Sequence, residues 1–146
     1  MGYRYLNTFP PKAVAYPFGF GLSYPTFDFN VMKFDSAGEG WVVTGLVTKT
    51  GKTRGKVVVQ LVVRAPRGKL DKPARELKGF AKTPELAPGE RFEVKRHVPA
   101  GRRASYDEQT GSWVIEPGKY VFMASKDASD CSLKKSVNVA GSGAVL

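Results

Sequence analysis

The chain has 146 residues, of which 42% are apolar, 12% aromatic and 25% charged, and its formal net charge is +10 at pH 7. This length allows one well-filled hydrophobic core rather than two, and the absence of a run of about eighteen apolar residues excludes a transmembrane helix. A single cysteine, Cys131, excludes an internal disulfide framework and a multi-cysteine metal site.

The first 26 residues do not have the pattern of a regular element. The opening MGYRYLNTFPP lacks the basic-then-apolar layout of a secretory signal, so we expect no export signal there, and the location of the protein stays open. YPFGFGLSYPTF, residues 16–27, carries five aromatic rings, which is unusual for a solvated loop. Its Gly19-Phe20-Gly21 lacks the preceding strand and following helix of a phosphate-binding loop. We expect these glycines to allow tight turns between large rings.

From Phe27 onward, period-two segments broken by turn residues predict short strands. Between 56 and 64 the apolar side chains occupy both faces, which predicts a central strand. Trp41 and Trp113 both fall in strand patterns, where a tryptophan is more often core than a binding platform. No segment has an apolar stripe at helical spacing. The predicted strands cover 27–34, 41–50, 56–66, 75–82, 91–98, 119–125 and 133–139, with a hairpin-like pair around Trp113.

These elements predict an all-β fold, an immunoglobulin-like antiparallel β-sandwich of about seven strands. Because the cysteine pair of immunoglobulin domains is missing, the fibronectin type III variety fits better. We expect an extended N-terminal arm over 1–26, the sandwich domain over 27–140 and a tail over 141–146.

The positive charge is concentrated in one third of the chain. Between Lys49 and Lys82 there are eleven Lys or Arg residues against Asp71 and Glu76, so this segment holds 11 − 2 = 9 of the excess charges. Such a block attracts nucleic acid, anionic lipid or an acidic polymer, or else forms a solvated face that keeps a domain soluble. The sequence leaves these alternatives open.

No set of residues predicts catalysis or metal binding. Asp107 and Glu108 are adjacent in a turn-like stretch, and Asp127 and Asp130 lie close together, but none of these has the separation and distinct environments of a glycosidase pair. His97 is the only histidine and falls on the outward face of strand 91–98, where a surface role is expected. We therefore assign no catalytic residue, no metal site and no cofactor.

Several motifs together resemble a known family. In order along the chain they are GYRYLNTF, YPFGFGLSYPTF, TKTGKTRGKVVVQL, KPARELKGF, LAPGE and SYDEQTGSWVIEPGKYVF. Their order and spacing are similar to the C-terminal end of glycoside hydrolase family 3 enzymes, the β-glucosidase and β-xylosidase group. The resemblance runs over residues 2–139, almost the whole chain.

The resemblance implies a fibronectin type III-like domain from about Phe27, preceded over 1–26 by the end of an α/β-sandwich domain and a linker. The family's catalytic aspartate and glutamate lie on domains that precede this region, so it carries no catalytic residue over to this chain. It also implies that the arm lies in the seam between domains. The expected interface residues are Tyr16, Phe18, Phe20 and Tyr24.

The predicted function is therefore a non-catalytic accessory domain that packs against the catalytic domains of a retaining β-glycosidase. The alternative is a module that binds an acidic or phenolic polymer, such as lignin or a charged polysaccharide, through the basic block and exposed aromatic rings. We expect neither nucleic acid nor a membrane as a partner. The candidate polymer-binding residues are Lys52, Arg54, Arg67, Lys69 and Lys72.

Overall fold

The computed structural model describes residues 2, 15–21, 26–37, 40–127 and 133–141. A short 3-10 helix, η2 (Ala100–Arg103), follows the fifth strand. The strands are β1 (Phe27–Ala37), β2 (Gly40–Lys49), β3 (Val58–Arg64), β4 (Glu76–Lys82), β5 (Arg91–Val98), β6 (Ser105–Asp107), β7 (Ser112–Val114), β8 (Gly118–Ser125) and β9 (Leu133–Val139).

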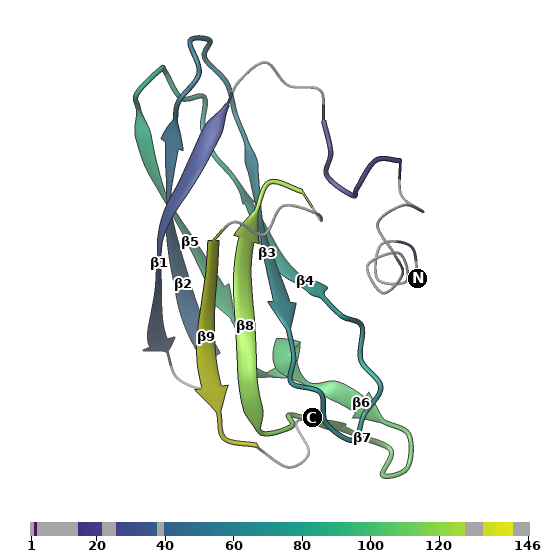
Figure 1. Cartoon of the computed structure of the whole chain (residues 1–146). Coiled ribbons are helices and arrows are strands. Elements are labelled where there is room, and N and C mark those ends of the chain that lie inside the picture. Colours follow the sequence, from purple (N-terminus) through teal and green to yellow (C-terminus); the bar gives the residue numbers. More distant parts are fainter. Residues whose placement is uncertain (1, 3–14, 22–25, 38–39, 128–132, 142–146) are drawn as a thin grey trace.

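Seven of these strands form two stacked sheets (Figure 1). The first sheet has the order β1-β2-β5, the second has the order β4-β3-β8-β9, and β6 and β7 form a separate hairpin. Neighbouring strands in both sheets and in the hairpin are antiparallel. The prediction of an all-β antiparallel sandwich with about seven strands is confirmed.

The core lies between the two sheets and follows the alternation in the sequence. Val59, Leu61 and Val63 of β3 are buried, as are Val94 and Val98 of β5. Because side chains at alternate strand positions point to the same face, the sheets bury one continuous apolar cluster. The other buried residues of this cluster are Val43, Val47, Leu86, Ala104, Ile115, Tyr120, Phe122 and Ala124.

The outer face of the four-stranded sheet is covered as well. Gln60 and Val62 of β3 lie opposite Ser125 and Met123 of β8, and all four are buried although they alternate with core positions. Part of this cover is the arm, where Gly19 lies against the Gln60 side chain. The prediction that β3 is a central strand with two apolar faces is confirmed, since β4 and β8 flank it.

Lys49, the first residue of the predicted basic block, is completely buried. Its Nζ donates hydrogen bonds to the carbonyl oxygens of Gly51 at 2.8 Å and Thr26 at 3.3 Å, and lies 5.2 Å from the centre of the Phe27 ring. The Thr26 carbonyl also accepts the backbone N–H of Thr50 at 3.0 Å. Lys49 therefore fastens the end of the arm to the end of β2 and adds no charge to the surface.

The two tryptophans differ in environment. Trp41 packs edge-on against Phe122 of the core, with ring centres 5.3 Å apart, and Arg103 lies over its ring at 4.1 Å. Trp113 is 50% exposed and contacts Tyr106 across the β6–β7 hairpin at 5.5 Å. The prediction that Trp113 belongs to the core is wrong, because the hairpin joins neither sheet and its ring-bearing face is left uncovered.

Candidate functional surfaces

The arm makes a tight turn beside the four-stranded sheet. The N–H of Phe20 donates to the carbonyl of Pro17 at 2.9 Å, and Gly19 has φ +87°. This geometry is a type II turn, in which the third position favours glycine because L side chains are strained at positive φ. A methyl group on Gly19 would also overlap the side-chain amide of Gln60. The sequence expectation that the glycine allows a tight turn between rings is confirmed here.

The rings of the turn face solvent. Tyr16 and Phe20 contact each other with ring centres 5.2 Å apart, and Phe18 and Phe20 are 54% and 46% exposed. Exposed rings at alternate positions of one short turn form an apolar patch of the kind that marks interaction surfaces. Tyr24, the fourth expected interface residue, lies outside the described residues.

The turn and the strand edge enclose an aromatic groove of about 650 Å³. Phe80 of β4 is 59% exposed and lines the groove together with Phe18 and Phe20. Phe80 was missed in the sequence because β4 reads as a polar strand, in which one outward phenylalanine does not stand out. The remaining lining residues are Gly19, Gly21, Thr26, Phe27, Lys56, Val57, Val58, Gln60, Leu77, Lys126 and Asp127.

The predicted basic block is divided between the two ends of β3. Lys52 and Arg54 precede the strand, and Arg54 lies 3.9 Å from Glu85 in an exposed ion pair. Arg67 and Lys69 follow the strand in the β3–β4 connection and are exposed. A seven-residue strand spans about 20 Å. The candidate polymer-binding residues therefore do not form one surface.

A basic groove of about 1010 Å³ lies along the β3–β4 connection. Arg64, at the end of β3, and Arg75, just before β4, contribute to it beside Arg67 and Lys69. Lys134 joins from β9, since its backbone lies opposite Met123 of β8. The other described lining residues are Ala65, Pro66, Gly68, Leu70, Asp71, Lys72, Pro73, Ala74 and Met123.

Glu116 holds the β3–β4 connection in place. Its Oε1 accepts the backbone N–H of Lys69 at 2.7 Å, and its other oxygen forms an ion pair with Lys72. The side chains of Lys72 and Glu116 are only 9% and 12% exposed. Any side chain at Gly68 would overlap the carboxylate. Lys72 is thus occupied inside the fold and is poorly placed to contact an external polymer.

The same contacts shift the ionisation of Glu116. Burial alone raises the pKa of its carboxyl, but the hydrogen bonds from Lys72 and from the Lys69 amide outweigh burial and hold the pKa below its ordinary value of 4.5. Its backbone carbonyl accepts the Tyr120 hydroxyl at 3.0 Å, and burial raises the pKa of that phenol. The Glu116 carboxylate is therefore ionised when it holds the β3–β4 connection in place.

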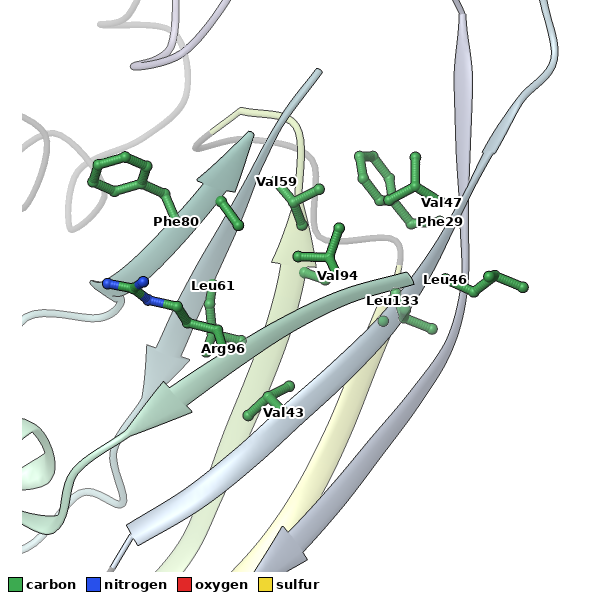
Figure 2. A pocket seen from close by; sticks show the side chains of 13 residues that line it. Phe29, Val43, Leu46, Val47, Val59, Leu61, Phe80, Val94, Arg96 and Leu133 are labelled. Atoms are coloured by element: carbon green, nitrogen blue, oxygen red, sulfur yellow. The ribbon is translucent and has the colours of Figure 1, made fainter. Parts of the chain in front are cut away.

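A cavity of about 30 Å³ lies between the sheets (Figure 2). Val43, Val59 and Val94 point into it, and Phe80 and Arg96 lie at its rim in Figure 2. Ligand sites are typically about 300–1,000 Å³, so this space is a packing gap. It is apolar and does not offer the polar partners that a buried water requires.

The acidic pairs weighed in the sequence form no catalytic arrangement in the described part of the chain. Asp107 Oδ1 accepts the N–H of Gln109 at 2.9 Å, which is a turn contact, and neighbouring Glu108 is exposed. His97 is exposed, as expected. Asp130 lies outside the described residues. Among the described residues there is no cluster of three potential metal ligands and no helix long and apolar enough to cross a membrane.

Comparison with known proteins finds consistent relatives. Residues 57–128 match the fibronectin type III-like domain. A β-glucosidase of Ruminococcus albus is 42% identical over 139 residues, which cover 90% of this chain and 15% of that protein. β-Glucosidase A of Butyrivibrio fibrisolvens is 40% identical over 154 residues, which cover 91% of this chain and 19% of that protein.

Solved structures give the same result over the whole fold. The family 3 β-glucosidase of Bifidobacterium adolescentis superposes with a TM-score of 0.90 at 33% identity, covering 100% of this chain and 22% of that one. β-Glucosidase 3B of Thermotoga neapolitana, solved with α-D-glucose, gives 0.86 at 38% identity, covering 94% and 19%. The chain thus spans less than a quarter of the length of each of these relatives.

Proposed function

The chain belongs to the fibronectin type III-like domains found in family 3 β-glucosidases, and on this premise we propose that it is a non-catalytic accessory domain of a larger β-glycosidase. In this proposal residues 1–26 are the arm that leaves the preceding catalytic domain, 27–140 are the accessory domain and 141–146 are a tail. The retaining chemistry of the glycosidase belongs to the domains that this chain does not contain.

The observation that carries the proposal is the aromatic patch. Phe18, Phe20 and Phe80 are each about half exposed around one groove. Half-exposed rings present about 100 Å² each, so covering all three contributes a gross ~7 kcal/mol at about 25 cal/mol per Å². Association and side-chain ordering offset much of this gain. A packing partner at this surface accounts for rings that a free-standing domain would leave in water.

The proposed interface includes Tyr16 and Tyr24 beside Phe18 and Phe20. Tyr16 supports this assignment because its ring already contacts Phe20 and remains mostly exposed. The role of the domain is then to cover apolar surface of the catalytic domains and to hold them in position. Losing the domain should lower the stability of the enzyme more than it changes the chemical step.

A chimera tests the interface. This chain replaces the corresponding segment of the Bifidobacterium adolescentis enzyme, and Phe18→Ser/Phe20→Ser/Phe80→Ser is compared with the control Tyr106→Ser/Trp113→Ser, which alters exposed rings of the hairpin. We expect the first variant to lower Tm by about 5 °C or more and the control by about 2 °C or less. Equal melting temperatures would contradict the proposal.

A second measurement tests the absence of catalysis. The isolated chain should not hydrolyse an aryl β-glucoside, because the proposal places both catalytic carboxyl groups outside it. Turnover that persists in a preparation free of other glycosidases would refute this part of the proposal.

A further inference from the structure

We propose that the basic groove beside the β3–β4 connection binds a carboxylated polysaccharide, a polymer of uronic acid units. Five cationic side chains line the groove: Arg64, Arg67, Lys69, Arg75 and Lys134. Asp71 is the one acidic side chain among the described residues that line the groove, and the charge of Lys72 is matched by Glu116. The exposed cations Arg64, Arg67, Lys69 and Lys134 against Asp71 give the groove a net charge of about 4 − 1 = +3.

The charges converge from separate parts of the chain. Arg64 ends β3, Arg67 and Lys69 lie in the connection, and Lys134 belongs to β9. A solvated face that only keeps a domain soluble intersperses charges of both signs. Here cations from three segments meet around one hollow of about 1010 Å³, which is at the upper end of the range of ligand sites and admits several sugar units.

The groove is held in shape before any ligand binds. Glu116 fixes the connection through the Lys69 amide and Lys72, and Gly68 packs directly on the carboxylate. Ordering a mobile loop costs free energy that reduces affinity. A loop that is already fixed avoids that cost, so the exposed side chains of Arg67 and Lys69 are presented from a stable backbone.

The chemistry of the lining favours carboxylates on a polymer without flat rings. A guanidinium group pairs with a carboxylate through two parallel hydrogen bonds. The described residues of the lining include no aromatic side chain, so they offer no platform for stacking nucleic-acid bases or phenolic rings. The choice of a polysaccharide among the remaining polyanions rests on the proposed function, which places the domain in an enzyme of carbohydrate breakdown.

The basic groove and the aromatic groove can be used at the same time. The aromatic groove includes Val57 and Val58 beside the start of β3 and extends along β4 to Leu77, whereas the basic groove includes Arg64 at the end of β3 and Arg75 just before β4. The arm rings Phe18 and Phe20 line only the aromatic groove, so a partner that covers them need not cover Arg67 or Lys134. The site can hold the enzyme near an acidic polymer while its catalytic domains stay packed.

The test uses the 146-residue chain and a purified oligogalacturonate, with dissociation constants measured by calorimetry in 20 mM and 200 mM NaCl. Arg67→Glu/Lys134→Glu should weaken binding in 20 mM NaCl at least tenfold. Lys33→Glu/Arg91→Glu has the same change in net charge but alters exposed positions on the other sheet, and should change binding less than threefold. The neutral pair Arg67→Gln/Lys134→Gln, expected to weaken binding about threefold, replaces the first variant if that one does not fold.

Binding that is lost selectively in the groove variant and weakens about tenfold in 200 mM NaCl supports the proposal. It is overturned if the oligogalacturonate does not bind, if both double variants lose affinity equally, or if single-stranded DNA of equal charge binds as tightly. The chimera measures melting and this assay measures binding, so the two proposals can fail separately.

Discussion

Replacing Glu116 with glutamine should destabilise the domain by about 2 kcal/mol at pH 7. The carboxylate accepts one backbone N–H and forms an ion pair with the Lys72 ammonium group, and hydrogen bonds to a charged group contribute about 1.5–3 kcal/mol. The amide keeps an acceptor for the Lys69 N–H but loses the attraction to Lys72. Because the lysine stem can turn its charge toward water, we do not expect the larger cost of a fully buried unpaired charge.

Urea unfolding and thermal melting measure this difference, and 2 kcal/mol corresponds to about 6 °C in Tm for a chain of this length. Glu85→Gln is the matched control. Its ion pair with Arg54 is 3.9 Å long and exposed, so its loss should cost less than about 0.5 kcal/mol. If the two variants are equally stable, the Glu116 carboxylate does not stabilise the β3–β4 connection.

The effect of Glu116 should also depend on pH. Folding lowers the pKa of its carboxyl, so the stability that it contributes is fully present above the ordinary value of 4.5 and is lost as the pH falls through the lower folded value. The difference in unfolding free energy between wild type and Glu116→Gln should therefore shrink below about pH 4.5. A difference that stays constant from pH 7 to pH 3 would refute the reasoning.

Three further substitutions test the other parts of the structure. Gly19→Ala should destabilise the turn of the arm by about 1–2 kcal/mol, because Gly19 has a positive φ. Limited proteolysis should therefore cut the arm of this variant faster than the arm of the control Gly21→Ala, whose added methyl group meets nothing within 4 Å. Trp41→Ala should destabilise the fold by about 3 kcal/mol in urea unfolding, whereas Trp113→Ala should cost less than about 1 kcal/mol because its ring is half exposed. Lys49→Met should cost about 1–3 kcal/mol, since it removes the Nζ hydrogen bonds to the carbonyl groups of Gly51 and Thr26. A Lys49→Met variant as stable as wild type would show that these contacts are dispensable.

Most of the fold could be predicted from period-two alternation. The predicted bounds 91–98 and 133–139 are the same as those of β5 and β9. Alternation fails where a strand pairs outside the sandwich, and Trp113 is exposed for that reason. It also cannot tell which lysines are taken up by contacts inside the fold, as Lys49 and Lys72 are, because that depends on loops that meet only after folding.

The candidate surfaces were less accessible from the sequence. The arm rings were identified by composition, but Phe80 joins their groove only because β4 pairs with β3. Lys134 lies far from the basic block in sequence and reaches the basic groove through the pairing of β8 with β9. Which residues cluster across neighbouring strands depends on the order of the strands in the sheet. A count of charges along the sequence does not reveal that order.

The hydrogen bonds that the Thr26 carbonyl accepts affect how force and rotation are transmitted between the arm and the sandwich. This carbonyl oxygen receives the N–H groups of Thr50 and Gly51 and the ammonium group of Lys49, so the chain cannot swivel freely where it enters β1. A domain attached directly on the N-terminal side of Thr26 would rotate together with the sandwich as one rigid unit. Any pivot between the two would have to lie upstream of this residue.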